Sequence, residues 1–152
     1  MHRRAALRTL VAGLAALRAA GAPGRAGAAD RLGFADLYGA VGPLGLAFSE
    51  TALRLRGKPV AMRGFLAPPL KAEATFFVLS SRPVSVCPFC QSDADWPHDI
   101  VVVYLAKGEA VEWRAAGRPI EVGGVLELGS RTDPDTGFVS QVRLTDARAR
   151  PV

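Results

Sequence analysis

Gly57-Lys58-Pro59-Val60-Ala61-Met62-Arg63-Gly64-Phe65-Leu66 decides the fold, because the chain repeats its pattern as Gly117-Arg118-Pro119-Ile120-Glu121-Val122-Gly123-Gly124-Val125-Leu126. In each copy a Gly-basic-Pro turn opens an extended run, and a glycine follows five residues after the proline. Proline suits the start of a strand, where no ladder donor is needed, and glycine lets a strand curl. The repeat therefore predicts two curled strands that begin alike.

Three further β-forming runs accompany the repeated strands. Residues 75–79 and 100–105 are dense in β-branched and aromatic residues, and residues 138–144 alternate. The order of curled strand, strand, strand, curled strand, strand resembles the five-stranded Greek-key OB-fold. We predict an all-β chain that forms a small five-stranded OB-like Greek-key barrel, with a long Cys-x-x-Cys loop between the second and third strands. A different small barrel or a sandwich is the alternative.

The segments before the first repeat divide the chain further. Residues 30–38 predict a helical turn that packs on the domain, and residues 39–45, with three glycines and a proline, predict a linker. Residues 52–56 alternate and predict a short strand that ends at the Gly57-Lys58 turn. We therefore assign residues 29–45 to a short N-terminal segment and linker, and residues 46–152 to the OB-like barrel domain.

Residues 1–28 have the pattern of a cleaved export signal. Arg3 and Arg4 begin a basic region, residues 10–17 form a short apolar run, and residues 26–28 fit a small-residue cleavage site. The paired arginines resemble a twin-arginine signal. The apolar run is shorter than the roughly 20 residues of a membrane span, so we expect a periplasmic or secreted protein with no transmembrane segment in the mature chain.

The charge distribution argues against nucleic-acid binding. Five of the 19 basic residues and none of the 14 acidic residues lie within residues 1–28, so the rest of the chain carries 14 of each. A neutral domain has no overall attraction for phosphate backbones. We expect no nucleic-acid partner.

The loop from residue 80 to residue 99 contains the residues best suited to chemistry. Cys87 and Cys90, the two cysteines of the chain, have a spacing that lets both sulfurs bind one metal ion. His98 follows as a third ligand, and Asp95, or else Asp93 or water, as a fourth. Zinc accepts this set, and copper(I) favours the two sulfurs.

Two other interpretations of the cysteine pair stay open. A redox dithiol is one, although the nearby acidic residues would raise a thiol pKa rather than lower it. A structural disulfide is the other, although so small a ring constrains little of the unfolded chain. Covalent haem attachment needs a histidine directly after the second cysteine, and Gln91 stands there.

Residues 54–105 resemble a family of small, uncharacterised, exported bacterial proteins that are often encoded beside ABC-transporter genes. The likeness is carried by these stretches: Gly57-Lys58-Pro59-Val60, Gly64-Phe65-Leu66, Pro69-Leu70, Phe77-Val78-Leu79, Cys87 to Cys90 and Val101-Val102-Val103. The resemblance implies an exported accessory domain with a cysteine-bearing loop, and periplasmic or membrane transport components as partners. The family has no established activity that the resemblance could imply for this chain.

Together these features favour an exported, soluble metal-binding accessory protein over an enzyme. The chain has one histidine beyond the signal, and neither a Gly-x-Ser-x-Gly motif nor a Gly-rich phosphate loop. A thiol oxidoreductase or redox sensor is the first alternative. A non-catalytic periplasmic interaction module, its loop closed by a disulfide, is the second.

Overall fold

The computed structural model describes residues 29–42, 45–68, 75–84, 96–111 and 117–152. The predicted export signal, residues 1–28, lies outside them. The elements follow this order: β1 (Asp30–Arg31), η1 (Phe34–Asp36), β2 (Tyr38–Gly42), β3 (Gly45–Phe48), α1 (Glu50–Leu55), β4 (Pro59–Leu66), β5 (Phe76–Ser80), β6 (Ile100–Leu105), β7 (Pro119–Thr132) and β8 (Val139–Pro151). Within this part of the chain, no helix has both the length and the apolar character needed to cross a bilayer.

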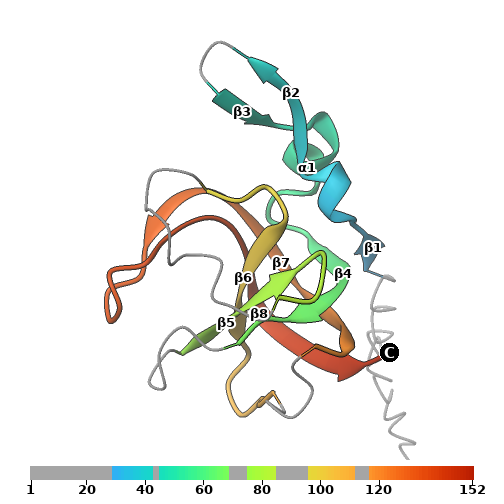
Figure 1. Cartoon of the computed structure of the whole chain (residues 1–152), viewed down its shortest axis with the longest axis vertical. Helices are drawn as coiled ribbons and strands as arrows, with labels where there is room; N and C mark the ends of the chain where they lie inside the picture. The colour runs from blue at the N-terminus through green and yellow to red at the C-terminus, as the bar shows by residue number, and fades with distance from the viewer. Residues whose placement is uncertain (1–28, 43–44, 69–74, 85–95, 112–116) are drawn as a thin grey trace, which may run out of the picture.

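The architecture is mostly β-sheet with little helix, which confirms the predicted all-β class (Figure 1). One six-stranded mixed sheet has the order β1-β4-β5-β6-β8-β7, and β4 also pairs with β7. The β1–β4 and β6–β8 pairs are parallel, whereas β4–β5, β5–β6, β4–β7 and β7–β8 are antiparallel. The long, curved β7 and β8 lie together along most of their length (Figure 1).

The two copies of the sequence repeat pair with each other. Residues 59–65 of β4 run antiparallel to residues 119–125 of β7, and Met62 lies opposite Val122 at the centre. Because the copies match and the pairing is antiparallel, each copy presents the same positions to the other about a local two-fold axis. The repeat is therefore the strand pair on which the rest of the sheet is built.

The glycine in each copy lets a neighbouring strand approach closely, a role that the sequence pattern did not predict. A Cβ on Gly64 would lie 2.6 Å from the carbonyl oxygen of Ser80, and one on Gly124 would lie 2.9 Å from that of Thr145. The register of β7 against β8 shifts between Gly123 and Val125, so the strand is irregular at Gly124. A side chain at either glycine would push the adjoining strand away.

The sheet encloses one main apolar core. Its fully buried side chains come from every strand of the sheet after β1: Val60, Met62, Leu66, Leu79, Val101, Val103, Val122, Leu126, Val142 and Leu144. Leu32 and Leu37, which flank η1, belong to the same cluster. This burial confirms that the expected helical turn packs on the domain.

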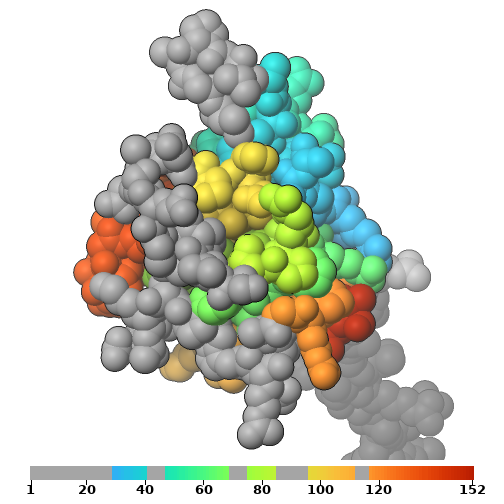
Figure 2. Space-filling model, viewed as in Figure 1, coloured from blue at the N-terminus to red at the C-terminus, as the bar shows by residue number. Residues whose placement is uncertain are grey.

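The predicted linker is instead a hairpin. β2 and β3 form a separate two-stranded antiparallel sheet, in which Gly42 pairs with Gly45. The hairpin projects from one end of the six-stranded sheet (Figure 1). In the space-filling view the N-terminal segment forms a ridge along one side of the molecule (Figure 2). Glycine-rich chain can pair through its backbone, which a hydrophobic pattern does not reveal.

The prediction of a strand at residues 52–56 was wrong, because helix α1 covers residues 50–55. The Ser49 hydroxyl caps the helix by accepting the Ala52 N–H at 3.0 Å. Ala52 and Leu55, three residues apart, are its buried side chains. In so short a segment, alternation and helical spacing place apolar residues at overlapping positions.

Candidate functional site

Of the predicted metal ligands, the described residues include His98. Cys87, Cys90 and Asp95 lie outside them, as does Asp93. His98 lies in an exposed turn just before β6, so its imidazole is accessible from solvent. Within the described ranges, no group of three or more His, Cys, Asp or Glu side chains is placed to hold a metal ion.

Both ends of the cysteine-bearing loop are held together by polar contacts. Ser80, at the end of β5, lies opposite Ile100, at the start of β6. One residue further out, the Ser81 N–H donates to the Asp99 carbonyl at 2.9 Å. The Arg82 guanidinium lies 3.4 Å from the Asp99 carboxylate, which adds an exposed ion pair. The backbone pairing of β5 with β6 thus continues for one residue beyond the end of β5 and the start of β6.

The two ends of the loop, residues 80–84 and 96–100, form what we call its neck, and an apolar cluster packs there. Val84 on one side and Trp96 on the other pack against three buried residues: Ala67, Val78 and Ile100. Trp96 also packs against the main core, so it anchors this end of the loop on the domain. The residues before and after the cysteine-bearing segment are therefore fixed at one place on the surface.

A hydrogen bond ties this neck to the N-terminal hairpin. The Trp96 Nε1–H donates to the Tyr38 hydroxyl at 2.7 Å, and Tyr38 stacks on Phe48 with ring centroids 5.6 Å apart. Burial raises the pKa of Tyr38 to about 12, against the opposing effect of the Trp96 hydrogen bond. Tyr38 therefore stays neutral over the physiological range.

Aromatic rings extend from the neck toward the β7–β8 turn. Phe138 lies 6.4 Å from Trp96 and 5.4 Å from Phe76, and Phe76 lies 5.5 Å from Tyr104, all between ring centroids. The Tyr104 hydroxyl donates to the buried Asp133 carboxylate at 2.9 Å. Burial and the Asp133 charge raise the pKa of Tyr104 to about 12. These contacts are typical of a rigid structural network rather than of a reactive site.

A second feature, which the sequence did not single out, lies on the outer side of the repeat pair. Arg63 of β4 lies opposite Glu121 of β7, which in turn lies opposite Arg150 of β8. Nε of Arg63 donates to Glu121 at 2.9 Å, and Nε of Arg150 donates to it at 3.1 Å. These two arginines hold the pKa of Glu121 down at about 2. Had the two copies of the repeat been predicted to pair as antiparallel strands, Arg63 would have been predicted to lie beside Glu121.

No protein-family model and no curated protein matches the sequence. In fold, the chain is similar to a DUF3299 family protein. That protein, from Pseudomonas aeruginosa PAO1, has a crystal structure that superposes with a TM-score of 0.53 at 18% sequence identity, and the match covers 83% of this chain and 97% of that one. At this identity the likeness concerns the fold alone. A neighbour in a domain family of unknown function is consistent with the uncharacterised family that the sequence resembles.

Proposed function

We propose that this protein is an exported metal-binding accessory protein whose ion is held by Cys87 and Cys90, with His98 and Asp95 assisting. The observation that supports this most is the neck, which brings Val84 and Trp96 into one apolar cluster. Cys87 follows Val84 by three residues, a distance that extended chain covers in about 10 Å at most. His98 follows Trp96 by two residues. Cys87 and His98 therefore each follow, within three residues, a side chain that packs in this one cluster.

The donor set decides which metals suit the site. Two thiolates and an imidazole are ligands that Zn²⁺ accepts in tetrahedral sites, and a carboxylate or water completes the set. Copper(I) favours the sulfurs and needs fewer oxygen ligands. The exposed turn at His98 leaves room for a partner to approach the ion, as delivery or exchange would require.

The OB-like arrangement is part of the same proposal. It is supported by the succession of pairs β4–β5, β5–β6, β6–β8 and β8–β7, with β7 also pairing with β4. The parallel β6–β8 pair among otherwise antiparallel neighbours fits a Greek-key path. Export rests on the pattern of residues 1–28, and service to a transport system rests on the family resemblance.

Elemental analysis combined with thiol counting tests the metal site. The chain is purified without chelator, its zinc and copper contents are measured, and its free thiols are counted before and after chelation. We expect about one ion per chain, lost in Cys87→Ser and Cys90→Ser and bound more weakly in His98→Gln. Ser92→Ala, which removes a loop hydroxyl, is the matched control and keeps its metal.

The same preparation separates the alternatives. Protein without metal whose Cys90→Ser variant traps mixed disulfides would replace the proposal with a thiol oxidoreductase. Protein without metal and without free thiols would replace it with a disulfide-closed interaction module. In that case Cys87→Ser would lower stability and leave partner binding intact.

A further inference from the structure

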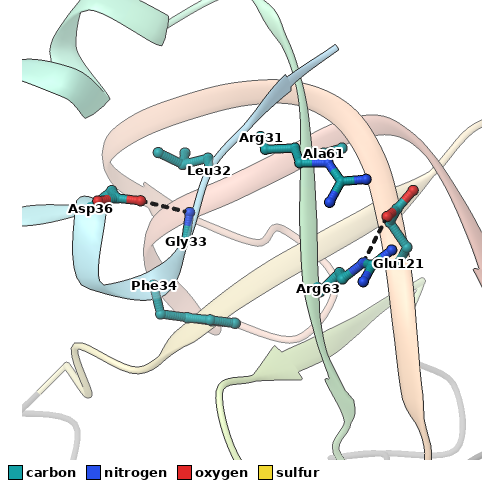
Figure 3. Close-up of a pocket in the computed structure, with 8 residues that line it drawn as sticks. All are labelled: Arg31, Leu32, Gly33, Phe34, Asp36, Ala61, Arg63 and Glu121. Atoms are coloured by element: carbon teal, nitrogen blue, oxygen red, sulfur yellow. Dashed lines mark hydrogen bonds and ion pairs between the residues drawn. The ribbon is translucent and has the colours of Figure 1, made fainter. Parts of the chain in front are cut away.

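A pocket of about 280 Å³ opens between the N-terminal segment and the repeat pair (Figure 3). Its lining residues come from β1, η1, β4 and β7 and the link between the first two: Arg31, Leu32, Gly33, Phe34, Asp36, Ala61, Arg63 and Glu121. This volume lies just below the usual range for drug-sized ligands, so the pocket suits a small molecule. None of these lining residues belongs to the cysteine-bearing loop.

One side of the pocket carries positive charge. Figure 3 shows the guanidinium groups of Arg31 and Arg63 on the same side as the Glu121 carboxylate. The Arg63 side chain is 56% exposed, whereas that of Glu121 is 8% exposed. The carboxylate is thus covered by arginines that still face solvent, so a ligand meets the guanidinium groups first.

Arginine donors remain available in this pocket. Among contacts with the described residues, Arg63 uses Nε for Glu121 and leaves both Nη groups to donate. Nothing in the same part of the chain accepts a hydrogen bond from the Arg31 side chain. Each guanidinium can therefore present a pair of N–H groups, the geometry that matches a carboxylate.

The charged side chains that line the pocket are balanced. Arg31 and Arg63 contribute two positive charges, against two negative charges from Glu121 and Asp36, and Glu121 has a further ion pair with Arg150, which is not a lining residue. The Asp36 carboxylate already accepts the Gly33 N–H at 3.0 Å. Both carboxylates are therefore already engaged, and the two lining arginines keep further N–H donors for a ligand.

The opposite side of the pocket carries its larger apolar side chains. Leu32 and Phe34 lie there in Figure 3, together with Asp36, whose carboxylate is held by the Gly33 N–H. A Cβ on Gly64 would lie 3.1 Å from the Phe34 ring, so the glycine makes room for it. Apolar walls beside a few convergent polar groups are typical of small-molecule sites.

We propose that this pocket binds a small monocarboxylate with an apolar or aromatic body. The carboxylate bonds to Arg31 and Arg63, and the body lies against Phe34 and Leu32. A phosphate has the same attraction for arginine, but it has no apolar part to lie against Phe34 and Leu32, so it fits this pocket less well. The site would be a second ligand site, independent of the proposed metal site.

Titration of the ¹⁵N-labelled full chain with benzoate tests the proposal, with benzamide as the neutral probe of equal shape and inorganic phosphate as the competing anion. We expect benzoate to shift the amide signals of residues 31–34 and 61–63, and benzamide and phosphate to bind at least about tenfold more weakly, the loss expected for a charge-assisted contact. Equal binding of benzoate and benzamide, or of benzoate and phosphate, would overturn the proposal.

Two substitutions assign the contact to the arginines. Arg31→Gln and Arg63→Gln should each weaken benzoate binding about tenfold or more. Arg148→Gln is the matched control, because Arg148 is 76% exposed and pairs with Glu109 away from the pocket lining; it should leave binding unchanged. Arg63 also holds Glu121, so thermal unfolding confirms that each variant is folded, and Arg31→Gln tests the site without breaking that pair. Unchanged binding in Arg31→Gln and Arg63→Gln would rule the pocket out.

Discussion

Gly64 lies so close to Ser80 that a Cβ added to the glycine would stand 2.6 Å from the Ser80 carbonyl oxygen and 2.9 Å from Leu79 Cγ. The first of these contacts is with backbone, which cannot rotate away. Gly64→Ala should therefore force β4 and β5 apart and lower the free energy of unfolding by about 1–3 kcal/mol, the usual cost of overpacking. Urea denaturation at neutral pH measures the change.

Gly123→Ala is the matched control for that substitution. Gly123 lies in the partner copy of the repeat, and a Cβ there would meet nothing nearer than the Val60 carbonyl oxygen at 3.9 Å. We expect its unfolding free energy to stay within about 1 kcal/mol of the parent value. Equal losses at the two glycines would mean that strand propensity, rather than the approach of β5, accounts for Gly64.

Glu121 should make stability depend on acid pH. Hydrogen bonds and charge from Arg150 and Arg63 lower its pKa from 4.5 to about 2. A carboxylate with a depressed pKa in the folded state contributes its full stabilisation above the unfolded pKa, and loses it as pH falls through the folded value. The parent should thus lose this contribution between about pH 4.5 and pH 2.

Glu121→Gln tests this dependence. It should lower the melting temperature at pH 7, and the gap from the parent should close as pH falls toward 2, because the parent then loses the same charge. Glu109→Gln removes a carboxylate paired with one well-exposed arginine, Arg148, so it should change the melting temperature little. A gap at Glu121 that stays constant over this pH range would contradict the ion-pair account.

The hydrogen bond between Trp96 and Tyr38 should couple the loop neck to the N-terminal hairpin. Tyr38→Phe keeps the ring that stacks on Phe48 and removes the acceptor of the Trp96 N–H. The cost should be about 1 kcal/mol in unfolding free energy. A double-mutant cycle with Trp96→Phe isolates the pair and should give a coupling of similar size. Additive losses would show that the contact contributes nothing of its own.

The sequence predicted much of the sheet because alternation, turns and the repeat are local signals. The strands predicted at 59–66 and 100–105 match β4 and β6, and that at 75–79 differs from β5 by one residue at each end. β7 runs on to Thr132, beyond Leu126 where the repeat ends, and β8 runs on to Pro151, beyond the predicted end at residue 144. Ala147, fully buried on β8, is too small an apolar residue to mark that extension by alternation.

Other features depend on contacts that a local pattern does not encode. Helix α1 is six residues long, and its clearest signal was the Ser49 cap followed by an acidic first turn rather than its apolar spacing. The β2–β3 hairpin forms through backbone pairing of glycine-rich chain. The arginine pocket needs the register between β4 and β7, which brings together residues 58 positions apart.

The sequence predicted which residues could bind a metal ion, but it did not predict how they are arranged in space. Cys87, Cys90 and Asp95 were chosen for spacing and chemistry, and they lie outside the described residues, so the site stays a prediction. The described flanks add a closed neck with His98 at its exposed edge. Trp96 packs against both apolar clusters, since a large aromatic residue in a polar loop has few other ways to bury its surface.

Asp133 should anchor the β7–β8 turn through its buried carboxylate. That carboxylate accepts the Thr136 N–H at 2.9 Å, the Thr136 hydroxyl at 2.7 Å and the Tyr104 hydroxyl at 2.9 Å. Burial opposes ionisation, but these hydrogen bonds outweigh it and lower the pKa of Asp133 below 3.8. Its stabilisation is therefore complete at neutral pH and declines as pH falls through that lowered value.

Asp133→Ala would remove the acceptor of three hydrogen bonds at once and should lower the unfolding free energy by about 1.5–3 kcal/mol at pH 7. Asp135→Ala is the control, because Asp135 belongs to the same turn with an exposed side chain, and its loss should stay within about 0.5 kcal/mol. Urea denaturation of both variants at pH 7 and at pH 3 gives the comparison, and the Asp133 effect should be smaller at pH 3. If the two variants lost the same stability, the turn would owe its structure to Pro134 and Gly137 rather than to the carboxylate. Gly137 has a backbone φ of 72°, which favours glycine.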